Sequence, residues 1–581
     1  MNRKILIIVL LSFVVLLLLS LFIPFVHHKA NVIFRLSKEK ITDILFEKEY
    51  LELNYSNYDL LDLYNSHYEN KNYFELAKIN SYLSQETFNR LLVLSNSWIE
   101  YKNPKTRLIP YKLGWGNEYN LWRPDQSTSD FFPFLLMSTY FTNKSQYNDL
   151  FSDTDIIKKA NYENGLPAMI EVKSGKLINK NQVIDYHFDN QIFGASEIVK
   201  DGMLPLIEYF GKNDWSYEYA TYLIETINEN CYINTSFGCI PSKVLEVNGE
   251  MLISLSRLYR ITNNDEYIRQ GLPIFKSYIL KLIPESNFLP CEEIDLYNFK
   301  CKSSEFSIGD HSNEIIFGLV EFYSIIKGTE YDNEIYHNII RIMLEKLKNE
   351  RLNEEGFWTN HGQVVDTFGY VHNAYLLYSK IEDYDVSFIN KSLKNLDNVD
   401  LVNFKVVDDQ SDFIESVIYL QHEYNLPEVD LWISKNMLNM MSNQNSKGMF
   451  MEDYKDGNVG RTMLMFLLYK TQGISVENWN SDINLGSYKY DGELYVYLES
   501  DDSWEGTIYF DEERSLNTFN IKYYPRINSF PEWFTINEDK EYEITMSDNA
   551  LYLNGKTIIK EGISVNLTKN ETFKFIIKEV S

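Results

Sequence analysis

The feature that most constrains the fold is a repeated pattern of amphipathic helices between residues 71 and 475. Apolar residues recur at steps of three and four, which places them on one helix face, as in Ile315, Leu319, Val320 and Tyr323. Short turns rich in Gly, Asn and Asp, such as residues 211–214, separate successive helices. Helices joined by short links lie antiparallel beside each other. The sequence therefore predicts a mainly α protein built from helical hairpins.

The individual helices are expected at residues 193–210, 215–228, 249–261, 265–283, 311–327, 333–348, 366–380, 412–423, 430–441 and 457–470. Hairpins of this kind can form either an open superhelix or a closed ring. An open solenoid favours a regular repeat length, whereas the links here are irregular and include long insertions at 163–190 and 284–310. We therefore expect a closed (α/α) toroid that carries functional loops on one face.

The pattern changes near residue 484, where strand-like runs replace the helices. Alternating β-branched and aromatic residues separated by Asp, Asn and Gly turns are typical of an antiparallel sheet. The expected strands lie at residues 493–498, 506–510, 518–522, 542–546 and 572–577. The sequence predicts that residues 484–581 form a small antiparallel β-sandwich-like domain that packs against the ring.

The N-terminus carries an apolar run at residues 5–26 that is interrupted only by Ser12, Ser20 and Pro24. About 22 helical residues rise roughly 33 Å, enough to cross a bilayer core of about 30 Å. The run ends without small residues, which favours an uncleaved anchor over a signal peptide. Arg3 and Lys4 place the short end in the cytoplasm. We expect residues 1–27 to be a cytoplasmic stub and transmembrane signal anchor, residues 28–70 a juxtamembrane segment, and the body to be extracytoplasmic at the cell membrane.

The chain has only four cysteines, and they fall into two close pairs. In an exported protein, Cys231 with Cys239 and Cys291 with Cys301 can each close a short loop as a disulfide bond. Four free thiols are one alternative. Zinc is another, although these spacings are not those of zinc fingers.

The net charge of −28 argues against a nucleic acid or an anionic membrane surface as partner, because phosphate binding needs clustered Lys and Arg. The membrane is therefore expected to be contacted only through the N-terminal helix.

Three segments resemble a known class of proteins. They are RPDQSTSDFFP at 123–133, FGASEIVKDG at 193–202 and YKDGNVGRT at 454–462, and RINSFPEWF at 526–534 is similar to the C-terminal β domains of the same group. The class is the six-hairpin glycosidase-like proteins, and the resemblance covers roughly residues 71–475. It implies an (α/α)6-type toroid. Members include polysaccharide hydrolases and lyases as well as catalytically silent proteins, so no catalytic residue is carried over.

Acidic residues occur where the chain enters several of the expected inner helices. Because an (α/α) toroid points these entries into one central cleft, they can supply the two carboxyls that glycosidic cleavage needs, one protonated and one ionised. Each can instead cap its helix by satisfying free amides of the first turn. The candidates for catalysis are Asp130, Asp201, Asp310, Asp366 and Asp412.

Several other polar residues share helix faces with these carboxylates. His311 and Glu314 lie three apart, and Asp366 shares one side of its helix with Tyr370 and Asn373. Asp408, Asp412 and Glu415 also share a face, where three like charges need a cation, an Arg or shared protons. Arg461 is a possible partner, and a purely structural network is the alternative. The candidates for binding sugar hydroxyls or carboxylates are Arg123, His311, Tyr370, Asn373 and Arg461.

The chain contains no zinc-protease, P-loop, nucleophile-elbow or dinucleotide motif, so the sequence predicts neither a cofactor nor a metal. We expect a membrane-anchored protein that binds an oligo- or polysaccharide and hydrolyses glycosidic bonds. Two alternatives remain. One is a non-catalytic glycan-binding or envelope-assembly protein. The other is a uronate lyase or epimerase, which would use a Tyr or His base with an Arg or Asn.

Overall fold

A computed structural model describes most of the chain after residue 58. The described residues are 59, 61–114, 120–178, 188–212, 215–290, 292–296, 298–302, 306–309, 312–404, 406–522, 524–546 and 549–580. Among them, none of the helices is long and apolar enough to span a bilayer. The predicted membrane helix lies outside these residues.

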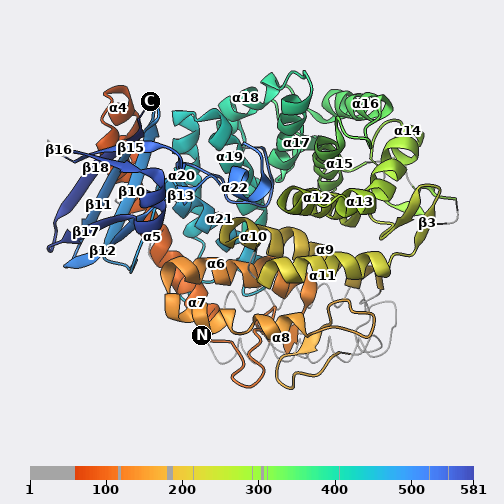
Figure 1. Cartoon of the computed structure of the whole chain (residues 1–581), viewed down its shortest axis with the longest axis horizontal. Coiled ribbons are helices and arrows are strands. Elements are labelled where there is room, and N and C mark those ends of the chain that lie inside the picture. Colours follow the sequence, from red (N-terminus) through yellow and green to blue (C-terminus); the bar gives the residue numbers. More distant parts are fainter. Residues whose placement is uncertain are drawn as a thin grey trace, which may run out of the picture.

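Between residues 73 and 470 the described chain is a succession of helices, which Figure 1 shows from orange to cyan. The predicted helices are present within a few residues of their expected bounds. The helices that are buried on nearly all sides are α6 (Phe132–Thr142), α10 (Leu204–Phe210), α12 (Leu245–Thr262), α15 (Glu314–Ile326), α17 (Phe368–Ile381), α19 (Val407–Tyr424) and α21 (Lys455–Lys470). Those that bury one face only include α11 (Trp215–Glu229), α13 (Glu266–Ser277), α16 (Glu334–Arg351) and α20 (Pro427–Met441).

The buried helices form a closed ring. Each packs on the next in chain order from α12 to α21, and α21 packs on α6 and on the π-helical segment η2 (Pro124–Phe131) that precedes it. The ring is completed by α9 (Phe188–Glu197) and η4 (Ile198–Met203), which run into α10 and contact both η2 and α12. This confirms the predicted helical-hairpin toroid. Counting α9, η4 and α10 as one unit, the described ring has seven inner units, one more than a six-hairpin ring has.

Two glycines allow the inner helices to approach closely near their first turns. A Cβ on Gly249 would lie 2.5 Å from the amide nitrogen of Ile315, and one on Gly457 would lie 2.6 Å from the Cα of Phe131. Neither position can therefore carry a side chain without moving the neighbouring backbone.

The C-terminal region is rich in strands, which are blue in Figure 1. A five-stranded antiparallel sheet has the order β10 (Ile483–Tyr490), β11 (Glu493–Ser500), β18 (Thr572–Glu579), β15 (Glu541–Met546) and β16 (Asn549–Asn554). A second sheet has the order β17 (Ile563–Leu567), β12 (Trp504–Tyr509) and β9 (Ser475–Val476). Helix α5 (Tyr73–Ile99) packs against β10 and β11 and joins this region to the ring.

One predicted strand is wrong. Residues 518–522 follow the β pattern, but they include the end of helix α22 (Arg514–Phe519) and a bend. The helix is held by tertiary contacts, because Arg514 donates to the carbonyl of Phe530 at 2.6 Å and forms an ion pair with Asp511. Here the chain leaves the sheets and residues 524–534, which we name the return segment, pack against the ring.

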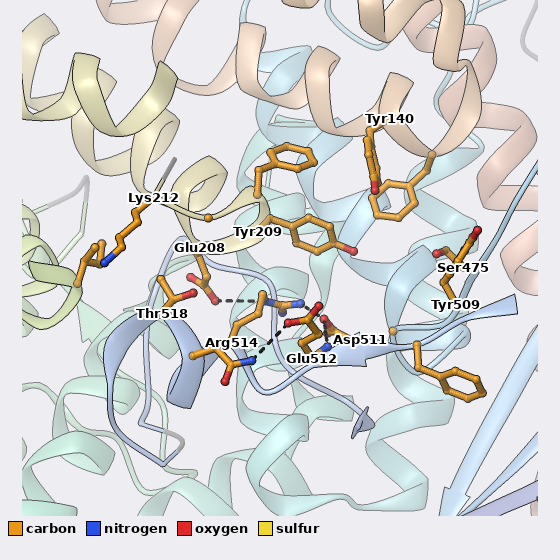
Figure 2. A pocket seen from close by; sticks show the side chains of 17 residues that line it. Tyr140, Glu208, Tyr209, Lys212, Ser475, Tyr509, Asp511, Glu512, Arg514 and Thr518 are labelled. Carbon is orange, nitrogen blue, oxygen red and sulfur yellow. Dashed lines mark hydrogen bonds and ion pairs between the residues drawn. The ribbon is translucent and has the colours of Figure 1, made fainter. Parts of the chain in front are cut away.

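A cavity of about 530 Å³ lies at the junction of the ring and the C-terminal region. Tyr140, Tyr209 and Tyr509 line it together with charged residues, and Figure 2 shows Arg514 at its edge between Glu208 and Asp511. None of the predicted catalytic or binding residues is among those that line this cavity.

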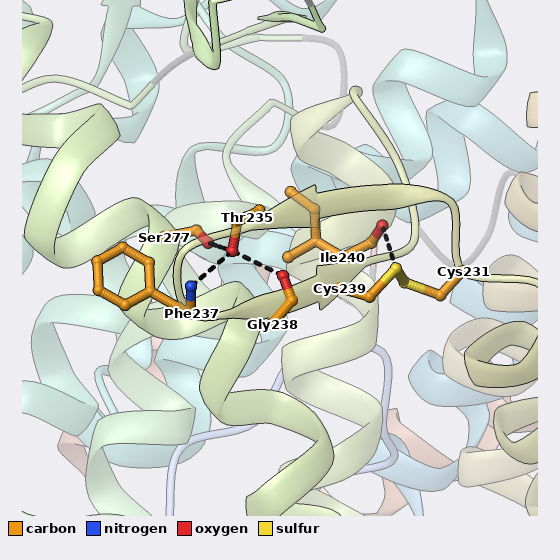
Figure 3. The surroundings of a disulfide bond; sticks show 7 residues. All are labelled: Cys231, Thr235, Phe237, Gly238, Cys239, Ile240 and Ser277. Atoms are coloured by element: carbon orange, nitrogen blue, oxygen red, sulfur yellow. Dashed lines mark hydrogen bonds between the residues drawn. A yellow bond between two sulfur atoms is a disulfide. The ribbon is translucent and has the colours of Figure 1, made fainter.

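The predicted disulfide between Cys231 and Cys239 is confirmed. It closes the hairpin of β3 (Ile233–Thr235) and β4 (Gly238–Ile240), which Figure 3 shows. Cys301 is also disulfide-bonded, and its predicted partner, Cys291, lies outside the described residues.

Candidate active site

The entry ends of the inner helices meet on one side of the ring and bring together carboxylates from five of its units. The first turns of α12, α15, α17, α19 and α21 carry no capping bond from an N-cap side chain. Several acidic residues of these helices instead contact residues of other ring units, as Glu250 and Glu314 contact Lys200 and Glu415 contacts Arg461. They form two clusters, each of which surrounds one cation.

The first cluster, the Arg461 group, consists of Asp130, Asp412, Glu415, Asn458 and Arg461. Arg461 binds three partners at once. Its Nη1 lies 2.5 Å from Asp130 Oδ1, its Nε lies 3.1 Å from Glu415 Oε2, and its Nη2 donates to Asn458 Oδ1 at 2.5 Å. Glu415 and Arg461 are buried, while the side chain of Asp130 keeps 18% of its surface exposed. Asp130 therefore offers a carboxylate at the open edge of the group.

Asp412 is the member of the Arg461 group whose surroundings favour a protonated carboxyl. Burial raises the pKa of its carboxyl well above the ordinary value, and the charges of Asp408, Asp366 and Glu415 raise it further. Asn458 donates to Asp412 Oδ1 at 2.7 Å and also to Asp408 Oδ1 at 3.1 Å. A proton on Asp412 therefore sits on Oδ2.

Asp130 has a raised pKa as well, but it lies beside a cation. Burial raises the pKa of Asp130 to about 6, against the opposing charge of Arg461 and with a further increase from Asp201. Above about pH 6 Asp130 is therefore ionised. Asp130 pairs directly with the Arg461 guanidinium, whereas Asp412 is bound by the neutral Asn458 amide, so the surroundings of Asp130 favour a carboxylate and those of Asp412 favour a protonated carboxyl.

Two tyrosines lie near Glu415 of the Arg461 group. Tyr419 donates its hydroxyl to Glu415 Oε1 at 2.6 Å, and the Tyr370 ring lies 6.5 Å from the Tyr419 ring. Burial and the charge of Glu415 raise the pKa of both phenols well above the ordinary value. Both phenols therefore favour the protonated form, in which Tyr419 donates to Glu415.

The second cluster, the Lys200 group, consists of Lys200, Glu197, Asp201, Glu250 and Glu314. The ammonium of Lys200 lies 2.9 Å from Asp201 Oδ2 and 3.4 Å from Glu250 Oε1, and it also donates to Glu314. All five residues are buried. Burial raises the pKa of Glu250 to about 8 and that of Glu197 well above the ordinary value. Burial also acts on Asp201, but the cations Lys200 and Arg461 bring its pKa below the ordinary value.

The two groups meet at Asp130, Glu197 and Asp201, whose carboxylate oxygens lie within 4.8 Å of one another. Three carboxylates at this spacing have the ligand type that a divalent cation prefers. However, the ammonium of Lys200 and the guanidinium of Arg461 already neutralise Asp201 and Asp130. We therefore interpret this junction as a proton-sharing contact between the groups.

The remaining predicted residues have several different environments. Asp366 is partly buried and accepts a bond from the Thr367 amide at 2.8 Å. The carboxylate of Asp125 pairs with Arg123 at 2.7 Å, and the Arg123 guanidinium lies 5.4 Å from the centre of the Tyr111 ring. Asn373 donates to a carbonyl of its own helix. Asp310 and His311 lie outside the described residues.

Sequence reasoning gave no role to Asn458, Tyr419 or Asn528. A signal for the first two exists, because Asn458 lies one turn from Arg461 and Tyr419 lies one turn from Glu415. Asn528, which donates to Asp201 from the return segment, has no such signal, since the two residues are separated by 327 positions.

No family model and no curated protein matches this chain. Among solved structures, it is similar to an inactive variant of the alpha-1,6-mannanase GH76A of Salegentibacter sp. HEL1_6, over 55% of this chain and 96% of that chain, at 14% identity and a TM-score of 0.37. It is also similar to cellobiose 2-epimerase from Spirochaeta thermophila, over 55% of this chain and 83% of that chain, at 12% identity and a TM-score of 0.38.

A third similarity is to the Lin0763 protein from Listeria innocua, over 65% of this chain and 96% of that chain, at 13% identity and a TM-score of 0.35. At these low TM-scores the similarities carry no argument about the reaction. The function must therefore be argued from the chain's own side chains.

Proposed function

We propose that this protein acts on carbohydrate and hydrolyses glycosidic bonds, with Asp412 as the general acid and Asp130 as the ionised carboxylate. The observation that carries the proposal is the connection between these two residues. Asn458 binds Asp412, Arg461 binds Asn458, and the same guanidinium binds Asp130. Two carboxyls of unlike proton affinity are thus held across one Asn–Arg bridge at the entry side of the ring.

The chemistry follows from these two protonation states. The glycosidic oxygen would take the proton of Asp412 as its bond to the anomeric carbon breaks. The carboxylate of Asp130 would either activate a water molecule or bond to the anomeric carbon, and the separation of the two carboxyls decides which. Arg461 would keep Asp130 ionised through its charge.

A test uses the full-length protein, solubilised in detergent, with a panel of oligosaccharides and detection of new reducing ends. Asp412→Asn and Asp130→Asn should each lower turnover by about 10²–10⁴-fold, with little change in fold. Asp482→Asn, which changes an exposed residue in the C-terminal region, is the matched control and should leave turnover unchanged. Turnover that survives both active-site substitutions would reject the assignment.

A second candidate function is glycan binding without catalysis. It is favoured by the number of bonds that the carboxylates already make, since a network this well satisfied could serve only to hold the ring together. Binding of an oligosaccharide that Asp412→Asn leaves unchanged, without new reducing ends, would support it. A lyase or epimerase that uses Tyr370 as base is less favoured, because the raised pKa of this phenol opposes formation of a phenolate.

We also propose that the body works outside the cytoplasm, tethered by the N-terminal apolar run. The disulfide of the β3–β4 hairpin supports an oxidising compartment. Protease treatment of intact cells should degrade the body, whereas protection until the cells are lysed would contradict export.

A further inference from the structure

We propose that the return segment forms the floor of the candidate active site, and that Tyr419 and Asn528 are the positioning residues through which it fixes Asp130 and Asp201. The inference rests on the proposed function, because it gives the C-terminal region a part in the same site. It concerns residues that touch the carboxylates or their partners and not the sugar itself.

The return segment is anchored to the ring by buried charged residues. Arg526 binds Glu208 of α10 at 2.8 Å and Glu532 of its own segment at 2.9 Å. Arg257 of α12 donates to the carbonyl of Ile527 at 2.8 Å, and His422 of α19 lies 2.7 Å from the carbonyl of Glu532. Three separate ring units therefore hold one short stretch of chain. Its position is fixed relative to the ring.

From this fixed stretch, one chain of bonds leads to Asp130. The amide of Ser529 donates to the Tyr419 hydroxyl at 3.3 Å, and Tyr419 donates to Glu415 at 2.6 Å. Glu415 in turn holds the Nε of Arg461, whose Nη1 holds Asp130. Because a backbone amide can only donate, it occupies a lone pair of the Tyr419 oxygen and directs the hydroxyl proton to Glu415.

A second contact leads to Asp201. The side-chain amide of Asn528 donates to the carboxylate of Asp201, whose other oxygen lies 2.9 Å from Lys200. Asp201 in turn has an oxygen within 4.8 Å of one on Asp130. The return segment thus reaches the candidate carboxylate from two sides, through an arginine and through a neighbouring acid.

The bonds make Arg461 the point at which the segment acts. The Glu415 carboxylate accepts a hydrogen bond from Arg461 Nε, and its other oxygen accepts one from the Tyr419 hydroxyl. Without the Tyr419 hydroxyl, Glu415 interacts more strongly with Arg461. The guanidinium then stabilises the negative charge of Asp130 less, and the pKa of Asp130 rises. Asp130 also faces Lys200, Asp201, Glu197 and Asp408, and these groups stay in place.

The first experiment compares Tyr419→Phe with Tyr424→Phe, a control on the same helix. Tyr419→Phe should lower kcat about tenfold, the effect of one lost hydrogen bond to a charged group, and move the acidic limb of the pH–rate profile to higher pH. Tyr424→Phe should change neither. A Tyr419→Phe enzyme with an unchanged acidic limb would overturn the positioning role, even if kcat falls.

The second experiment needs no activity. Urea midpoints are measured for Tyr419→Phe, Asp130→Asn and the double variant, and a shift smaller than the sum of the two single shifts shows that the residues are coupled. Additive shifts would overturn the proposal. If the residues are coupled but no sugar is cleaved, the proposed function fails and the positioning of Asp130 stands.

The third experiment tests whether Asn528 acts through its hydrogen bond to Asp201 or only by filling volume. Asn528→Asp places a second carboxyl against Asp201 and should lower kcat more than Asn528→Ala does, because like charges at this spacing repel. Equal effects of the two substitutions would mean that Asn528 only fills volume, and would remove it from the proposal.

Discussion

The Lys200 group and the Arg461 group contain the same chemistry but differ in access. Each sets one cation among several carboxyls at the entry ends of the inner helices. In the Lys200 group every carboxyl is buried, whereas in the Arg461 group Asp130 keeps part of its surface exposed and Asp408 lies near it. Asp412 is as buried as Glu197, so Asp130 is the residue that distinguishes the groups. A substrate can reach Asp130, and the proposed chemistry therefore belongs with the Arg461 group and a structural role with the Lys200 group.

The difference has a local cause. Lys200 and Asp201 lie in the π-helical segment η4, and a Cβ on Gly202 of the same segment would lie 2.9 Å from the carbonyl of Ser129. The neighbouring chain therefore covers these side chains closely. Arg461 lies on α21, where Asn458 and Lys455 at the helix entry remain partly exposed. The solvent exposure of each group therefore depends on how tightly the neighbouring chain packs at the first turns of its helices.

The sharpest test of this comparison is to remove the buried cation. Lys200→Met leaves Asp201, Glu250 and Glu314 without their counter-charge in a site that water does not reach. We expect a loss of unfolding free energy toward about 5 kcal/mol, the upper range for breaking a buried pair. Urea unfolding followed by circular dichroism measures this loss. A loss below about 1 kcal/mol is typical of an exposed ion pair and would contradict a stabilising role of the buried Lys200 group.

Removing the other cation should cost less stability and more activity. In Arg461→Met, Glu415 keeps its bonds from Tyr419 and Thr462, and Asp130 can turn toward solvent. We expect a loss nearer about 3 kcal/mol, together with a loss of turnover. Arg461→Lys keeps the charge and should recover part of the stability. A larger loss of stability than in Lys200→Met would reverse our ranking of the two groups.

The contrast between the groups also shows what the sequence could predict. The helices, the ring and the convergence of acidic residues follow from apolar spacing and short links, which are local patterns. The spacing of Asp412 and Glu415 predicts a shared helix face, and Arg461, the partner that the sequence suggests for this face, pairs with Glu415. These residues lie on neighbouring helices of one ring, so predicting the ring brings them together.

What the sequence could not predict depends on long-range packing. The strand expected at 518–522 has β-type residues, but Arg514 and Phe530 hold this stretch in a helix and a bend. Asn528 reaches Asp201 only because the chain returns from the sheets to the ring. The burial that separates the two carboxylate groups likewise depends on the close approach of η4 to η2.

The two groups should also lose stability in different pH ranges. A carboxyl whose pKa is raised by folding stabilises the protein below its unfolded pKa, and this contribution is lost as the pH rises through the folded pKa. The loss spans 3.8 to about 6 for Asp130 and 4.5 to about 8 for Glu250. Each contributes a slope of at most about 1.4 kcal/mol per pH unit.

Unfolding free energy measured against pH can therefore separate the groups. Glu250→Gln should flatten the curve from about pH 4.5 to 8, and Asp130→Asn only from about pH 3.8 to 6, so only Glu250→Gln should act between about pH 6 and 8. The same flattening from both substitutions would mean that the two groups titrate as one unit through Glu197 and Asp201, and our division between them would be wrong.

The smallest effect is expected at Lys455, which lies at the exposed edge of the Arg461 group. Lys455 lies 3.2 Å from Asp408, with 32% of the lysine side chain exposed. An ion pair that water can reach contributes at most about 1 kcal/mol, so Lys455→Met should shift the urea midpoint only slightly, and 0.5 M salt should weaken the difference further. Because the substitution is the same as in Lys200→Met, the two variants compare one change in two settings. Equal losses would show that access does not distinguish the two groups, since a lysine that water reaches would then stabilise the ring as much as one that water does not reach.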